Sequence, residues 1–116
     1  MWNQRRINKY NNRRTRYNGR IYDSALEGSE AQNLDLRKKA GDIKDWESQV
    51  LIELRPYGEL WRKYRADFIV THNDESLEII ETKGFWTEGA RQKWRMLEIL
   101  CDKKILPYDK LTVVKR

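Results

Sequence analysis

Two apolar segments joined by a five-residue polar loop constrain the fold more than any other part of the chain. Residues 65–71 and 77–83 are rich in apolar and β-branched side chains, and the polar residues 72–76 between them are typical of a turn. Strands joined by so short a loop pair antiparallel. The pattern therefore predicts a β-hairpin in which Asp67 stands on the first strand and Glu81 on the second.

The simplest register of this hairpin pairs Ile69 with Ile79 and then places Asp67 directly opposite Glu81. Lys83 follows two residues after Glu81 and points to the same face. Like charges that face each other destabilise a sheet, and a divalent cation between them removes that penalty. Because hard oxygen ligands suit Mg²⁺, the hairpin predicts a site for Mg²⁺ or Mn²⁺ at Asp67 and Glu81.

Apolar residues flank the two acids on both faces of the predicted hairpin. A sheet that is apolar on both faces is covered on both, which disfavours the alternative of solvated acids on an open face. Strand alternation places on one face Ala66, Phe68, Val70 and Ile80, and on the face of the acids Ile69, Leu77 and Ile79.

The net charge of +6 is concentrated at the N-terminus. Residues 1–20 contain seven basic side chains and no acid, with asparagines between them, so nothing there is available to form a core. We expect a disordered basic arm over residues 1–20 and a single domain over 21–116. Such an arm binds nucleic-acid phosphates, although a solubilising tail or an RNA-binding arm is an alternative. The predicted DNA-binding residues are Arg5, Arg6, Lys9, Arg13, Arg14, Arg16 and Arg20.

The lone Cys101 cannot form an internal disulfide, which fits a reducing compartment. No apolar run approaches the ~20 residues of a membrane span, and the N-terminus has no apolar signal core. The expected protein is soluble and cytoplasmic.

The remaining elements follow from caps, breakers and periodicity. Ser24 and Glu27 form a capping box at the start of a helix, and Thr87 is a plausible N-cap for a second. The expected elements besides the hairpin are helices at 24–39 and 88–103 and strands at 43–54 and 111–114. The order α-β-β-β-α-β predicts an α/β fold in which helices flank a mixed sheet, with the last two strands parallel across a right-handed crossover.

Several further polar and aromatic residues are weaker candidates. Glu27 is either a helix-capping residue or a site residue, with Glu30 one turn later as the fallback. Lys93 lies on the edge of the apolar stripe of the second helix and either reaches a phosphate or extends to solvent. The others are Gln49 beside the acids, His72 as a turn residue, and Phe85 and Trp86, which either stack on a base or close the core.

The acid on one strand and the Glu-x-Lys on the next resemble the PD-(D/E)XK nuclease superfamily, which has the restriction-endonuclease-like fold. Asp67 and Glu81-Thr82-Lys83 match its motif, with Glu27 as the helix glutamate and Ala66 in place of the proline. The spacing is similar to that of archaeal-type Holliday junction resolvases. The fuller pattern over residues 20–105 resembles small phage-encoded nucleases of this fold, which implies the cytoplasm of the host cell as the location if the protein is encoded by a phage.

This resemblance implies a Mg²⁺-dependent or Mn²⁺-dependent DNA endonuclease. Its metal ligands would be Asp67, Glu81, the Thr82 backbone carbonyl and Glu27, and Lys83 would act on the attacking water or on the phosphate. The substrate would be branched or double-stranded DNA, cut by a homodimer in the manner of a resolvase. The alternatives are an exonuclease or nicking enzyme of the same fold, and a non-catalytic nucleic-acid-binding protein that uses the basic arm.

Overall fold

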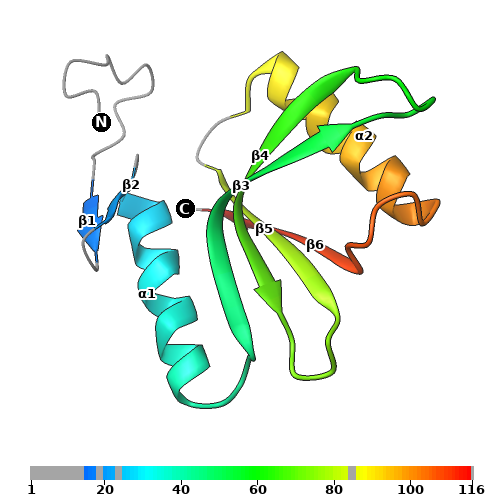
Figure 1. The fold of residues 1–116 in the computed structure, drawn as a ribbon. Helices are drawn as coiled ribbons and strands as arrows, with labels where there is room; N and C mark the ends of the chain where they lie inside the picture. The colour runs from blue at the N-terminus through cyan, green and yellow to red at the C-terminus, as the bar shows by residue number, and fades with distance from the viewer. Residues whose placement is uncertain (1–14, 18–19, 23–24, 84–85, 116) are drawn as a thin grey trace.

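The computed structural model describes residues 15–17, 20–22, 25–83 and 86–115 (Figure 1). These residues form a four-stranded mixed sheet and two helices. A separate two-stranded sheet precedes the first helix. The elements are β1 (Thr15–Tyr17), β2 (Arg20–Tyr22), α1 (Ala25–Lys39), β3 (Asp45–Leu54), β4 (Arg62–Thr71), β5 (Leu77–Lys83), α2 (Glu88–Asp102) and β6 (Lys110–Lys115).

The larger sheet has the strand order β3-β4-β5-β6. Its first three strands are antiparallel neighbours, and β6 runs parallel to β5 after the chain has passed through α2. The mixed α/β architecture and the parallel last pair are therefore confirmed. From α1 onward the elements follow the expected order, but β1 and β2 were not predicted.

The predicted hairpin forms from β4 and β5. Thr71 pairs with Leu77 and Ile69 with Ile79, as expected, but the ladder ends at the pair Phe68–Ile80. The predicted direct backbone pairing of the two acids is therefore wrong. Beyond this pair, β4 and β5 no longer pair through their backbones, and the Thr82 N–H of β5 donates to the Asp67 side chain instead.

The end of α1 and the start of α2 follow from their local sequence. Gly41, with φ +83°, ends α1, and the backbone N–H of Asp42 donates to the Arg37 carbonyl at 2.9 Å. Thr87 caps α2 by accepting from the Ala90 N–H at 3.0 Å. The predicted cap Ser24 lies outside the described residues.

Two cores lie on opposite faces of the sheet. The α1 side contains Phe68 and Val70, whereas the α2 side contains Ala66 and Ile69. The prediction that Ala66 shares a face with Phe68 is therefore wrong, because the alternation is interrupted at the residue between them, Asp67. The opposite position on β3 is Gln49, which has φ +58°, and the pairs on either side of it, such as Val50–Ala66, are intact. The alternate side chains of β3 and β4 that face α1 on one side of this position therefore face α2 on the other side.

The basic N-terminal segment, which we expected to be disordered up to residue 20, contains strand residues from Thr15 onward. β1 and β2 pair antiparallel, with Thr15 opposite Tyr22, and both contact α1. Arg16 and Arg20 lie on these strands, so a disordered arm that extends to residue 20 is wrong. The predicted DNA-binding residues Arg5, Arg6, Lys9, Arg13 and Arg14 lie outside the described residues. Across the described part of the chain, no helix is long and apolar enough to cross a membrane.

Candidate functional site

The two predicted acids lie where β4 and β5 part. Glu81 is 3% exposed and Asp67 is half-buried. One oxygen of Asp67, Oδ2, accepts from both the backbone N–H and the side-chain hydroxyl of Thr82, each at 2.8 Å. The Asp67 carboxylate therefore accepts a hydrogen bond from β5 where the backbone pairing has ended. The two bonds hold it beside Thr82, the residue that follows Glu81.

Two donors hold the Glu81 carboxylate. The buried Tyr64 hydroxyl on β4 donates to Oε1, and the Lys83 ammonium lies 3.0 Å from Oε2. The structure thus brings together Asp67, Glu81 and Lys83, the three residues that the sequence motif joins. Tyr64 was not predicted as a site residue, although a tyrosine within an apolar strand needs a hydrogen-bond partner.

Burial and mutual repulsion perturb the titration of the acidic pair. Desolvation, followed by the charge of Asp67, raises the pKa of Glu81 to about 7, although Lys83 acts in the opposite direction. Burial also raises the pKa of Asp67, against the Thr82 hydrogen bonds and the charge of Lys83. The two carboxyls therefore lie close enough to repel each other when both are ionised. Both pKa shifts make the second negative charge costly in the metal-free protein.

An aromatic cluster adjoins Lys83. Its ammonium lies 5.3 Å from the centroid of the Trp86 ring, and Trp86 is 5.9 Å from Trp94. Trp94 in turn lies 6.1 Å from Tyr64. The half-buried Trp86 therefore lies against Trp94 and borders the site. Phe85 lies outside the described residues.

Glu27 belongs to a neighbouring network. It is 6% exposed and accepts a hydrogen bond from the Gln49 side-chain amide. Gln49 lies opposite Asp67 on β3, and its side-chain oxygen is 3.4 Å from Arg65. The fold thus brings the helix glutamate towards the acids through Gln49. Within the described residues, no three or more His, Cys, Asp or Glu side chains form a group placed to bind a metal.

The donor set at the pair nevertheless fits Mg²⁺. This cation binds proteins through one or two carboxylates and keeps several waters, so a third acid is not required. Asp67 and Glu81 lie close enough to repel each other when both are ionised. A cation there would be held by these two carboxylates, with the Thr82 carbonyl, next to Glu81 in the chain, as a further oxygen.

Three other predicted residues lie elsewhere in the fold. Lys93 is half-buried on α2. His72, predicted only as a turn residue, lies 2.7 Å from the buried Glu78, which also accepts from Thr112 at 2.5 Å. Burial raises the pKa of Glu30, and the charge of Glu78 adds to this shift. These side chains form a second polar cluster, and Glu30 does not join the acidic pair.

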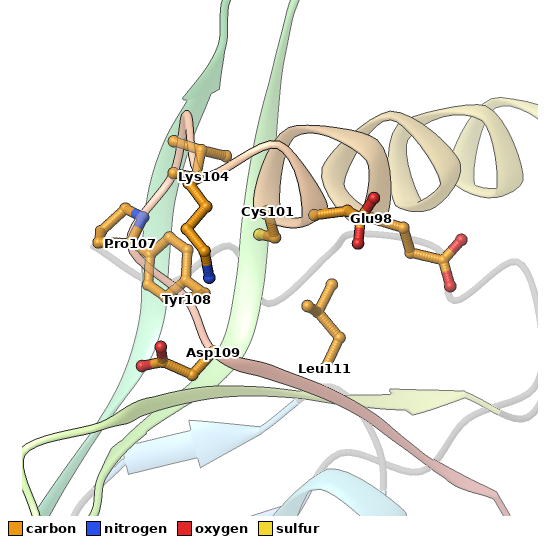
Figure 2. A pocket seen from close by; sticks show the side chains of 9 residues that line it. Glu98, Cys101, Lys104, Pro107, Tyr108, Asp109 and Leu111 are labelled. Atoms are coloured by element: carbon orange, nitrogen blue, oxygen red, sulfur yellow. The ribbon is translucent and has the colours of Figure 1, made fainter.

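A cavity of about 490 Å³ lies at the other end of α2. Figure 2 shows Glu98 and Cys101 of the helix around it, with Tyr108 and Asp109 from the following loop. The Asp109 N–H donates to the Leu77 carbonyl, so this cavity lies at the start of β5. The acidic pair lies at the opposite end of that strand.

The fold and the site together define a mixed α/β protein with a buried acidic pair and a lysine on adjacent strands. Residues 7–113 match the family described as "Protein of unknown function (DUF1064)", and the chain belongs to that family. No match was found among curated proteins or among solved structures. The family match spans every helix of the described structure and the strands from β1 to β5.

Proposed function

We propose that the protein is a metal-dependent DNA endonuclease with a restriction-endonuclease-like fold of the PD-(D/E)XK type. One observation carries the proposal: Asp67, Glu81 and Lys83 converge on adjacent strands in a partly buried site, where burial and the charge of Asp67 raise the pKa of Glu81. An acidic pair held in this way is costly without a cation. A protein that only bound nucleic acid would have no need of it.

A bound Mg²⁺ or Mn²⁺ would stabilise charge on phosphate oxygens and make water nucleophilic near neutral pH. Asp67 and Glu81 would hold that ion. Lys83 keeps its ammonium 3.0 Å from Glu81, where it can orient the attacking water or offset charge that develops on the phosphate. Tyr64 fixes Glu81 from the other side, and burial raises the pKa of its hydroxyl, which therefore stays a donor.

The finer proposal is that branched DNA is the substrate and that a homodimer cuts it. Its support is the resemblance of the motif spacing to junction resolvases. An exonuclease or a nicking enzyme would use the same three residues, so the cut products must distinguish these activities.

The test is cleavage of closed circular plasmid, linear duplex and four-way junction DNA with Mg²⁺, Mn²⁺, Ca²⁺ or EDTA. We expect cleavage with Mg²⁺ or Mn²⁺ and none with EDTA, and we expect internal cuts in the junction. Asp67→Asn should lose this activity, whereas Asp42→Asn, a change to an exposed acid between α1 and β3, should keep it. If the wild-type protein binds DNA but cuts none of these substrates with any cation, it is a binding protein and the proposal fails.

A further inference from the structure

A groove of about 420 Å³ lies between the start of β4 and the side of α2 that faces it. Trp61, Met96 and Ile99 supply apolar surface in the groove, and Arg91 and Arg95 supply positive charge. Glu88 also lines it. The groove therefore combines an aromatic ring with two arginines at exposed positions of one helix.

The arginines around this groove are weakly compensated. Arg62 lies 4.9 Å over the Trp61 ring and donates to the Trp61 carbonyl. In the part of the chain that the structure describes, no carboxylate lies within ion-pair distance of Arg62 or Arg91. Arg95 is 3.5 Å from Glu98, an exposed pair that contributes little. Three guanidinium groups beside a tryptophan favour an anionic partner with flat faces.

We propose that this groove binds an unpaired DNA strand next to the site of cleavage, an inference that rests on DNA being the substrate. Phosphates would contact Arg62, Arg91 and Arg95, and a base would stack on Trp61. Because a duplex hides its base faces by stacking, the aromatic surface selects an unpaired strand. Duplex DNA would therefore not be held in the groove.

The groove is connected to the acidic pair by two elements. Trp61 stands six residues before Asp67, which is ~20 Å at ~3.3 Å per strand residue. Glu88 of the groove follows two residues after Trp86, which contacts Lys83. A strand in the groove would therefore lie several nucleotides from the scissile phosphate. Branched DNA, in which duplex and unpaired strand meet, supplies both parts.

The first test is DNA binding in EDTA, measured by fluorescence anisotropy over a salt series. The double variant R91A/R95A removes two exposed charges from α2, and K38A/K39A is the matched control with two exposed charges removed from the last turn of α1. At ~0.7 per contact on a single strand, R91A/R95A should lower the salt slope by ~1.4 and weaken oligothymidine binding roughly 25-fold at 0.1 M salt. The control should change binding much less.

The second test changes the aromatic surface alone. Trp61→Leu should weaken oligothymidine binding by roughly 5- to 150-fold, the range of base stacking on an aromatic ring, and leave blunt duplex binding unchanged. Thermal unfolding monitored by circular dichroism checks that the variant is folded. If Trp61→Leu is unfolded, the R91A/R95A comparison of single strand with duplex still decides the matter.

Equal losses for duplex and single strand in R91A/R95A would show a simple phosphate contact and overturn the inference. Unchanged DNA binding would also overturn it and would point to another anionic partner, such as an acidic protein segment. If the variants lose single-strand binding but the wild-type protein cuts no DNA with any cation, the groove stands and the proposed nuclease fails. If the wild-type protein cuts DNA and the variants bind as it does, only the groove inference fails.

Discussion

Replacing Asp67 by asparagine should stabilise the metal-free protein at pH 8 while abolishing cleavage. The pKa of Glu81 is raised to about 7 from an ordinary 4.5. The native state therefore keeps a proton that the unfolded chain releases, and stability falls as the pH rises from about 4.5 through about 7. At ~1.36 kcal/mol per pKa unit, the whole shift corresponds to roughly 3 kcal/mol.

The Asp67→Asn variant should regain only part of the stability that the wild-type protein loses as the pH rises. Desolvation is the largest cause of the Glu81 shift and persists, whereas the charge of Asp67, the second cause, is removed. Asparagine keeps an oxygen for Thr82 and can donate to Glu81 through its amide. We expect a gain of about 1 kcal/mol at pH 8, or roughly 4–8 °C in Tm, and almost none at pH 5.

The assay is thermal unfolding in EDTA at both pH values, with the exposed Asp42→Asn as the matched control. Asp67→Ala is the informative comparison, because it removes the same charge but leaves the Thr82 N–H without its acceptor. That loss costs about 1–3 kcal/mol, so alanine should be less stable than asparagine. An asparagine variant that is destabilised at pH 8, or stabilised equally at both pH values, would refute the reasoning.

Three further changes test the site and the N-terminal segment. Lys83→Ala should lower turnover by roughly 10²–10³ while calorimetry still detects Mn²⁺ binding, because the proposed role of the ammonium is to act on the attacking water or the phosphate and not to bind the metal. Tyr64→Phe removes a hydrogen bond that lowers the pKa of Glu81, so the rise of activity with pH should move to higher pH in a pH–rate profile. Deletion of residues 1–14 removes five basic side chains and, at ~0.9 per contact, should flatten the salt slope of duplex binding by up to ~4.5, with turnover at saturating DNA nearly unchanged. Deletion should stop before Thr15, because β1 begins there.

The hairpin and the helix ends could be predicted because short-range chemistry determines them. β5 has the bounds expected from its apolar run, and Thr87 and Gly41 act at the helix ends where their side chain or backbone freedom is required. The β1–β2 hairpin was missed although a signal existed. Asn18-Gly19, a pair typical of two-residue hairpin turns, stands between Tyr17 and Arg20, but the dense positive charge suggested disorder.

The contacts of the site could be predicted only in part. The motif brings Asp67, Glu81 and Lys83 together by strand position alone. The hydrogen bonds of Glu27 with Gln49 and of Tyr64 with Glu81 join residues that lie 22 and 17 positions apart. They depend on how the ribbon turns, which no local pattern specifies. A glutamine at positive φ has no sequence signal of the kind that glycine gives.

The change of face at Gln49 and Asp67 explains why the acids lie at this position. In a continuous ladder, β5 amides are satisfied by backbone carbonyls of β4. Here the ladder stops at Phe68–Ile80, and the Thr82 N–H is satisfied by the Asp67 carboxylate instead. The same break moves Tyr64 to the α2 side, where its hydroxyl reaches Glu81. The bend that ends the ladder thus positions both carboxylates. Their repulsion is a consequence of where the backbone places them, so the side chains cannot relieve it by adopting other conformations.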